Sequence, residues 1–126
     1  METLSYEVAL SRMKSSGYGA AEIAINPDKS GWREIKKLTD SFGLVLIAQL
    51  PFANGKSVDE YMKSFTYHLL SIAELQPALI NCHTGFDYYT TSENLAIIET
   101  ATRIATEVGI PVCHEIHRGR FTYSPY

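Results

Sequence analysis

The sequence predicts an α/β fold built from parallel (β/α) units, with about four strands and four helices. Helical and strand-like patterns alternate along all 126 residues. The predicted strands are almost uniformly apolar, which is typical of strands with both faces covered, as in parallel sheets. Helices between successive strands imply right-handed βαβ connections. Alternation alone leaves open whether the strands belong to a barrel or to a small, open, doubly wound sheet.

The first part of the chain contains two predicted helices, each followed by a strand. The first helix spans residues 4–15 and stops at a glycine, and the strand at residues 20–25 ends at an Asn-Pro pair. The second helix has apolar side chains spaced three and four residues apart: Trp32, Ile35, Leu38 and Phe42. Gly43 stands where a left-handed C-terminal cap belongs, and an apolar strand at residues 44–50 follows it.

The third helix is predicted to open at Ser57, which forms a capping box with Glu60. Its buried stripe consists of Val58, Tyr61, Met62, Phe65, Leu69 and Ile72. A proline introduces the third strand, at residues 78–83.

The fourth helix begins with a second capping box, formed by Thr90 and Glu93. Its apolar side contains Ile97, Ile98, Ala101, Ile104, Ala105 and Val108. Gly109 and Pro111 end the helix, and residues 112–115 are predicted to form the fourth strand.

Composition indicates an ordinary globular chain, with residues 1–126 forming one domain. Hydrophobic residues make up 45% and charged residues 20%, and the net charge of −3 gives no general attraction to nucleic acid or to an anionic membrane. We expect no secretory signal and no membrane span, because no apolar run is long enough. The two cysteines show no zinc or redox spacing, which favours a cytoplasmic location.

Polar side chains collect at the predicted carboxyl ends of the strands, where parallel α/β folds bind ligands. They are Glu22, Asn26, Gln49, Asn81, His83, Glu115, His117, Arg118 and Arg120. The opposite ends of the strands follow ordinary helix caps such as Gly43 and Gly109. This asymmetry predicts a functional rim.

The two-residue period of a strand predicts which of these side chains meet. Asn81 and His83 share one face of their strand, and Cys113 and Glu115 share one face of theirs. If His83 and Glu115 point into one hollow, Cys82 points outward and Cys113 inward. A disulfide between the two cysteines is then excluded.

The candidates at the strand ends each have two interpretations. Glu115 is a ligand or acid/base group, or it forms a structural ion pair with Arg118, because an unpaired carboxylate is costly at the end of a buried strand. His83 is a ligand or it hydrogen-bonds a loop. Glu22 contributes to catalysis or has a structural partner.

The remaining histidines and arginines are interpreted from their positions. His117 and Arg118 suit an anionic sugar phosphate, or they belong to a solvated loop. His68 lies in a helix and His114 alternates away from the rim, so both are interpreted as structural.

Three runs resemble the sugar phosphate isomerase/epimerase family of xylose-isomerase-like TIM barrels. They are NCHTGFDY at residues 81–88, VCHEIHRGR at residues 112–120 and GYGAAEI at residues 17–23. The His-Glu-x-His-Arg part is the most specific of them, and the matches together span most of the chain.

The resemblance implies a site that binds a divalent metal, Mn²⁺, Mg²⁺ or Zn²⁺, at the strand ends. The family's fifth strand carries a carboxylate that is the first metal ligand and often half of an acid/base pair, and Glu115 matches it. Related apurinic-site endonucleases bind zinc through histidines on strands three and four. His83 matches the second of these positions, but Gln49 occupies the first, which counts against a nuclease. Glu22, Gln49, His117 and Arg118 are the expected substrate-binding residues.

The chain corresponds to about half of such a barrel, because a complete one takes about 250 residues. Its first helix precedes the counterpart of the family's second strand, and its last strand matches the fifth. Four parallel strands leave two sheet edges and an apolar interior uncovered. We therefore expect a homo-oligomer that forms through the exposed edges.

Three functions follow as hypotheses. The first is metal-assisted proton transfer next to the carbonyl of a small sugar or sugar phosphate, carried out in a completed barrel. The alternative is a non-catalytic incomplete barrel, either a binding or assembly module or an inactive remnant. The third is a nucleotide- or phosphate-binding open sheet, which is weakly supported because the Gly-Lys-Ser at residues 55–57 lacks the upstream glycine of a P-loop.

Overall fold

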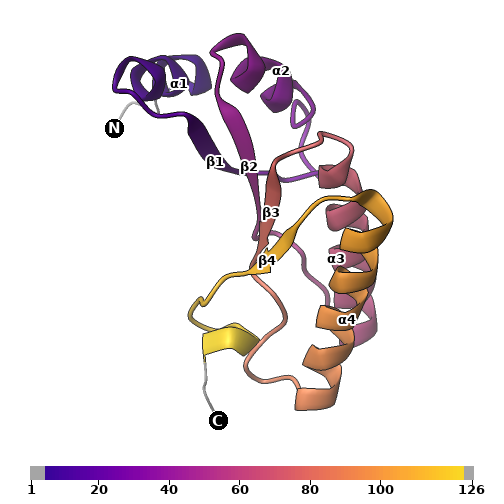
Figure 1. Cartoon of the computed structure of the whole chain (residues 1–126). Coiled ribbons are helices and arrows are strands. Elements are labelled where there is room, and N and C mark those ends of the chain that lie inside the picture. The colour runs from indigo at the N-terminus through magenta and orange to yellow at the C-terminus, as the bar shows by residue number, and fades with distance from the viewer. Residues whose placement is uncertain (1–4, 124–126) are drawn as a thin grey trace.

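The structure, a computed structural model, describes residues 5–123 and consists of a four-stranded parallel sheet with helices between the strands (Figure 1). The elements in chain order are α1 (Tyr6–Ser15), β1 (Ala20–Ala24), α2 (Glu34–Ser41), β2 (Val45–Leu50), α3 (Val58–Ala73), β3 (Leu79–Cys82), α4 (Thr91–Val108), β4 (Val112–His114) and the 3-10 helix η1 (Phe121–Tyr123). The strands follow the order β1-β2-β3-β4, and every neighbouring pair is parallel. The predicted α/β fold of parallel units is confirmed.

The helix boundaries follow from local capping, with two corrections to the prediction. α1 has Ser5 as its N-cap, and the predicted start at Leu4 lies outside the described residues. α2 begins only at Glu34 and has Phe42 as its C-cap, so Trp32 and Phe42 flank the helix rather than belonging to it. Trp32 is nevertheless buried, because the turn before α2 folds its ring onto the core.

The two predicted capping boxes form to different extents. At α4, the Thr90 hydroxyl accepts from the Glu93 N–H and the Glu93 carboxylate accepts from the Thr90 N–H, which completes the box. At α3, the Ser57 hydroxyl accepts from the Glu60 N–H, but the Glu60 carboxylate accepts from the N–H of Lys56 at 2.8 Å instead of that of Ser57. The α3 prediction is therefore only half correct.

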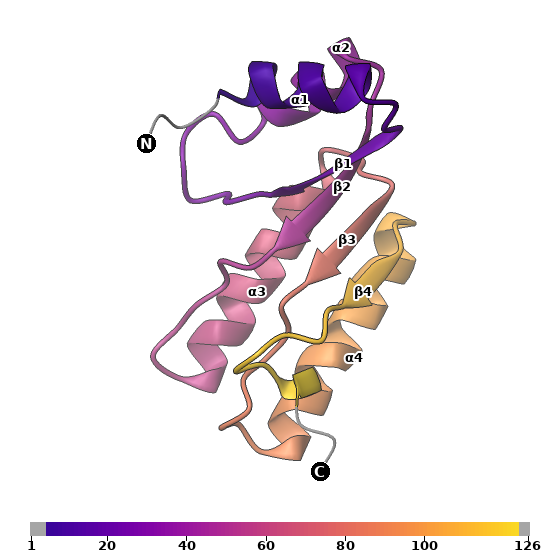
Figure 2. The same cartoon turned by 90° about the vertical axis from the view of Figure 1, so that its left-hand side faces the viewer.

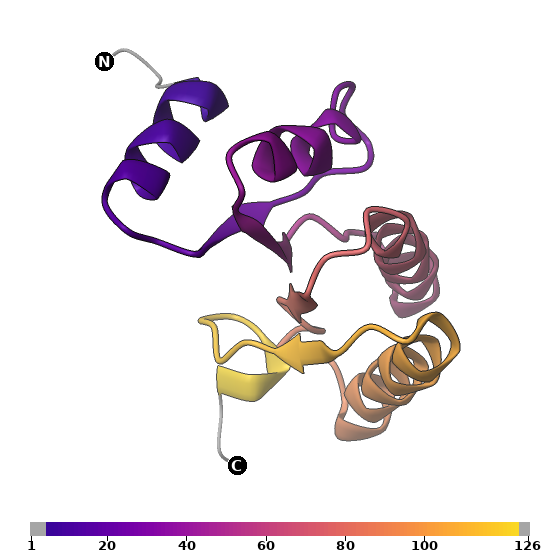
Figure 3. The same ribbon diagram turned by 45° about the horizontal axis from the view of Figure 1, so that its top comes forward.

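One face of the sheet packs against helices and contains the core. Figure 3 shows α2, α3 and α4 on the same side of the curved sheet, as in part of a (β/α) barrel. The fully buried side chains on this side include Leu46, Ala48, Leu50, Tyr61, Phe65, Leu69, Ile72, Ile80, Ile97 and Ile104. The buried stripes predicted for the third and fourth helices therefore face the sheet.

The other, concave face of the sheet is open. Burial alternates along β1 and β2, and Val45, at the start of β2, is 51% exposed on this face. Uniform apolarity predicted strands covered on both faces, and this is wrong for residues 5–123. Apolar composition shows that a surface favours burial, but it does not show that the chain supplies a cover.

The sheet ends in two edges among the described residues. β1 pairs only with β2, and β4 only with β3. Figure 2 shows the four strands side by side, with α1 near the β1 edge and α4 behind β4. Within residues 5–123, no helix combines the length and the apolarity needed to cross a membrane.

Candidate functional site

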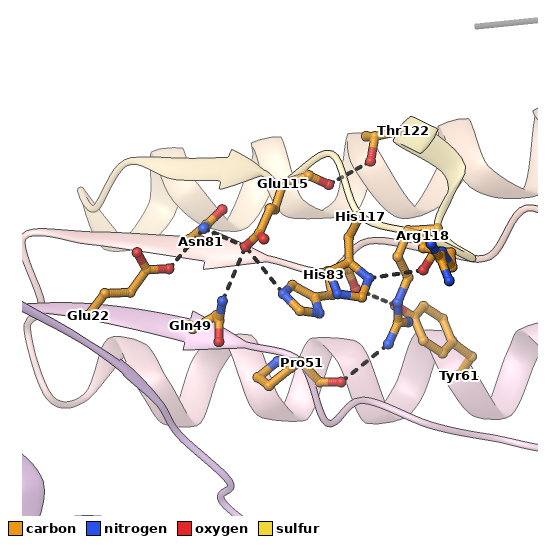
Figure 4. A network of polar contacts seen from close by, with 11 residues as sticks. Glu22, Gln49, Pro51, Tyr61, Asn81, His83, Glu115, His117, Arg118 and Thr122 are labelled. Carbon is orange, nitrogen blue, oxygen red and sulfur yellow. Dashed lines mark hydrogen bonds and ion pairs between the residues drawn. The ribbon is translucent and has the colours of Figure 1, made fainter. Parts of the chain in front are cut away.

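The parallel register brings four strand ends together on the concave face. Gln49 of β2 pairs in register with Asn81 of β3, and Asn81 pairs with Cys113 of β4. His83 lies one residue beyond β3, and Glu115 lies one residue beyond β4. Because side chains two residues apart share a face, Asn81, His83 and Glu115 all point into the same hollow, as the sequence predicted (Figure 4).

The Glu115 carboxylate is the centre of this cluster. Its Oε2 atom accepts hydrogen bonds from Asn81 Nδ2 at 2.9 Å and Gln49 Nε2 at 3.2 Å, and it lies 3.2 Å from His83 Nε2. Asn81 Nδ2 also donates to Glu22 Oε1 at 3.0 Å. The network therefore links all four strands, and Glu22 has the structural partner that was its alternative interpretation.

The surroundings of Glu115 keep its carboxylate ionised. Partial burial by itself raises the pKa of Glu115, but the hydrogen bonds from Gln49 and His83, together with the positive charge that His83 and His117 carry when protonated, outweigh it. The net pKa of Glu115 is lower than usual, so the group is an anion at neutral pH. The side chain keeps 32% of its surface exposed and is accessible to a ligand.

His83 is the least exposed member of the cluster. Its ring stacks on that of His117, with centroids 4.3 Å apart and 24° between the planes. Burial lowers the pKa of His83, and the charges of His117 and Arg120 lower it further, although Glu115 acts in the opposite direction. A neutral imidazole with Nε2 protonated donates its hydrogen bond to the Glu115 anion.

His117 and Arg118 lie at the exposed margin of the site. His117 Nδ1 is 2.9 Å from the Arg118 carbonyl oxygen, and both side chains are exposed. Among the described residues, Arg118 makes no ion pair with Glu115, so that structural interpretation is wrong. Amide and imidazole donors satisfy the carboxylate instead.

The loop that carries His83 is fixed from behind by a buried tyrosine. The Tyr61 hydroxyl accepts from the Gly85 N–H at 3.0 Å and donates to the His83 carbonyl at 3.3 Å. Burial raises the pKa of Tyr61 to about 12, so the hydroxyl stays protonated and keeps both roles. The position of His83 is therefore set by α3 as well as by its own strand.

Arg120 joins three loops at the rim, a role that its sequence position does not predict. Its guanidinium donates to the carbonyls of Gly85 and Pro51, each at 3.3 Å, and lies 4.5 Å from the centroid of the Phe86 ring. It therefore connects the segments that follow β2, β3 and β4. Position alone, two residues after Arg118, was the only sequence signal for it.

The remaining histidines lie away from the hollow, and the two cysteines lie on opposite faces of the sheet. His114 Nδ1 is 2.6 Å from the Thr84 hydroxyl, and burial lowers the pKa of His114. His68 is fully buried in α3, with Nε2 3.0 Å from Asp28 Oδ2. Both contacts agree with structural roles. Cys82 is buried and Cys113 is exposed, and both are free, as the alternation of the strands predicted.

The described residues do not by themselves fit a divalent metal. Within residues 5–123, no three His, Cys, Asp or Glu side chains are grouped closely enough to hold an ion. Catalytic zinc takes three protein ligands, whereas Glu115 and His83 supply one carboxylate and one imidazole, and Glu22 joins them only through Asn81. Glu115 Oε2 is, moreover, already occupied by three donors. Metal binding therefore needs ligands from other strands.

No protein-family model matches this sequence, and no curated protein is similar enough to count as a relative. The chemistry of the site is therefore inferred from its own geometry and from the motifs of the sequence.

Proposed function

We propose that this chain is the Glu115-bearing half of a sugar or sugar phosphate isomerase or epimerase, and that Glu115 moves a proton at the carbon next to the sugar carbonyl. The observation that carries this proposal is the convergence of Gln49, Asn81 and His83 on one carboxylate oxygen at the strand ends. Three donors from two other strands hold the carboxylate in one orientation, and a general base needs such positioning to reach a substrate proton.

The same donors limit the basicity of Glu115. Hydrogen bonds to the anion lower its pKa, and a weaker base abstracts a carbon-bound proton less readily. All three of these donors bond Oε2, so Oε1 is the carboxylate oxygen left to take the substrate proton. His117 and Arg118, exposed at the margin, supply donors and positive charge for a phosphate.

Completion of the site is part of this proposal. Binding of Mn²⁺, Mg²⁺ or Zn²⁺ beside Glu115 requires a completed barrel in which further strands provide ligands. A small-molecule substrate in the cytoplasm belongs to the same proposal. The net charge of −3 and the unpaired cysteines on opposite faces of the sheet support it.

Deuterium exchange tests the proton transfer directly. The chain is incubated in D₂O with D-fructose 6-phosphate and Mn²⁺, and NMR follows deuterium entering the carbon next to the carbonyl. Glu115→Gln should slow this exchange by roughly 100-fold, the lower end of what a general base contributes. Glu99→Gln, which removes an exposed carboxylate on α4, is the matched control and should leave the rate unchanged.

Two results count against the catalytic proposal. One is exchange that is equally fast with Glu115→Gln, and the other is no exchange above the protein-free rate. The second result favours the alternative, a non-catalytic incomplete barrel. The open edges and the absence of a three-ligand metal group among residues 5–123 favour that alternative.

A further inference from the structure

Both edges of the sheet have a cavity beside them. The cavity at β1 has a volume of about 510 Å³ and is lined by Ala24 of β1, by Tyr6 of α1 and by Leu38 of α2, among others. The cavity at β4 has a volume of about 380 Å³, and Val112 of β4 and Thr102 of α4 contribute to it. In a (β/α) barrel, these are the places where the preceding and following units pack.

The outer side of α4 is suited to contact another helix. Leu95 is 46% exposed on this side, and Thr102 and Thr106 line the cavity below it. The Thr102 hydroxyl donates to the Ile98 carbonyl at 3.0 Å, and the Thr106 hydroxyl donates to the Thr102 carbonyl at 3.1 Å. Because these hydroxyls are satisfied within the helix, the surface that they present is largely apolar.

α1, by contrast, buries little of its own surface. Only Leu10 of this helix is buried, while Tyr6 is 51% and Val8 41% exposed. In a barrel, the helix before a strand packs over that strand and over the preceding one. β1 has no preceding strand among the described residues, so α1 extends beyond the sheet with little beneath it.

The two edges are therefore complementary. The β1 edge carries a helix but has no strand on its outer side, whereas the β4 edge presents a strand and a cavity but has no helix beyond it. Backbone groups face outward at both edges. The Ile25 N–H donates to the Gln49 carbonyl, and the Glu115 N–H donates to the Cys82 carbonyl. Because the backbone groups of successive residues in a parallel strand point to opposite sides, the N–H and C=O groups of Ala24 and His114 point outward.

We propose that a second copy of this chain fits both edges, so that β4 of each copy pairs in parallel with β1 of the other. Two four-stranded sheets then supply the eight strands that close a (β/α)₈ barrel. The pair is twofold symmetric and leaves no sheet edge open. α1 of each copy covers the cavity beside β4 of the other and contacts the outer side of its α4.

Closure also joins the two candidate sites. β1 and β4 become neighbours across each seam, so Glu22 of one copy lies on the strand next to Glu115 of the other. Each Glu115 then has two Glu22 carboxylates nearby, one joined to it through Asn81 of its own copy and one on the neighbouring strand of the other copy. This last consequence rests on the proposed function, but the closure itself does not.

The mass of the full chain in solution tests the closure. Light scattering and sedimentation equilibrium should give twice the 14.1 kDa of one chain. Ala24→Pro removes the N–H that faces the seam, while the hydrogen bonds between β1 and β2 remain, so this variant should be a folded monomer. Ala24→Val keeps the N–H and should stay dimeric. Circular dichroism verifies folding in each case.

A second pair of variants tests the helix contact independently. Thr102→Glu places a charge in the cavity beside β4 and should raise the dissociation constant of the dimer by roughly tenfold or more, because a buried, unpaired carboxylate is costly. Ala96→Glu, at an exposed position of α4 outside the cavity, should not change it.

Three results overturn the closure. They are a wild-type chain that is monomeric at every concentration, a chain that forms larger open assemblies, and a Thr102→Glu variant with unchanged association. A monomer that still exchanges deuterium at the ketose refutes the closure but leaves the proposed function standing. A dimer that shows no deuterium exchange supports the closure but counts against the proposed function.

Discussion

At the scale of single residues, the candidate site depends on one hydrogen bond between the His83 imidazole and the Glu115 carboxylate. Glu115 is ionised because three donors stabilise its anion, and His83 is neutral because burial outweighs the attraction of that anion. The Nε2–H of His83 is therefore the hydrogen-bond donor in a contact between a neutral group and a charged one. Both groups release protons more readily in the folded chain than in the unfolded one.

We expect the free energy of unfolding to fall as the pH is lowered. A group whose pKa is lower in the folded state leaves the unfolded state with more bound protons, so acid favours unfolding. For His83, this loss begins near pH 6.5, the pKa of a free histidine, and ends at its lowered folded pKa. For Glu115, it begins near its ordinary pKa of 4.5 and continues below that value.

Urea denaturation across a pH series measures this dependence. With His83→Gln, the free energy of unfolding should fall less steeply between pH 6.5 and the lowered folded pKa of His83. His114, whose pKa is also lowered by burial, should account for part of the remaining fall. Glu99→Gln, which alters an exposed carboxylate on α4 outside the cluster, is the control. A His83→Gln variant with the same pH dependence as the wild type would show that His83 does not lose proton affinity on folding.

At the scale of elements, the loop after β3 is more rigid than its position at the surface suggests. The Asn94 carboxamide is fully buried, accepts from the Phe86 N–H at 3.2 Å and donates to the Phe86 carbonyl at 2.9 Å. Tyr61 and Arg120 hold Gly85 from two other sides. The loop that positions His83 therefore depends on side chains from α3, α4 and the segment after β4.

We expect Gly85→Ala to destabilise the chain by about 3 kcal/mol. Gly85 has φ +62, which costs a non-glycine residue roughly 1–2 kcal/mol. The added Cβ would also overlap the Asn94 carboxamide, and breaking a buried hydrogen-bonded contact costs about 1–3 kcal/mol more. Gly109→Ala, at φ +69 with open space around it, should lose only the first part. Equal losses in urea denaturation would refute the overlap.

What the sequence predicts well at this scale is local. The left-handed glycines at the ends of α2 and α4 and the complete capping box of α4 depend on residues close in the chain, so spacing is enough to predict them. The spacing of Trp32 fits a helix, but the preceding Gly31 adopts φ +83 and delays the start of α2. A backbone reversal of this kind does not appear in an apolar pattern.

The candidate site was predicted in part for the same reason. Strand period placed His83 and Glu115 in one hollow, because their alternation depends only on their own strands. Asn81 and Gln49 were predicted to lie at the rim, but their hydrogen bonds to Glu115 were not, since an amide donor carries no charge pattern that indicates its partner. Arg120 was also predicted to lie at the rim, but its role was not, because it binds backbone carbonyls, which are present at every position of a sequence.

At the scale of the whole molecule, stability is unevenly distributed among the strands. β2 and β3 each have two partners, whereas β1 and β4 each have one among the described residues. α1 contributes a single buried side chain, Leu10, to the end of the molecule that contains β1. Elements with little buried surface open with low free energies, so the N-terminal βα unit should open before the centre of the sheet.

We expect hydrogen exchange to reveal both this gradient and the proposed closure. In a dilute sample, amides of β1 and α1 should exchange faster than those of β2 and β3, because fewer contacts must break to expose them. As the protein concentration rises, pairing with a second copy should protect the outward amides of Glu22 and Ala24, while β2 and β3 change little. Ala24→Pro should abolish the concentration dependence at Glu22 but keep the slow exchange of the central strands. Protection of β1 that is the same at every concentration, measured by mass spectrometry on the full chain, would mean that the edge stays open or is covered from within one chain.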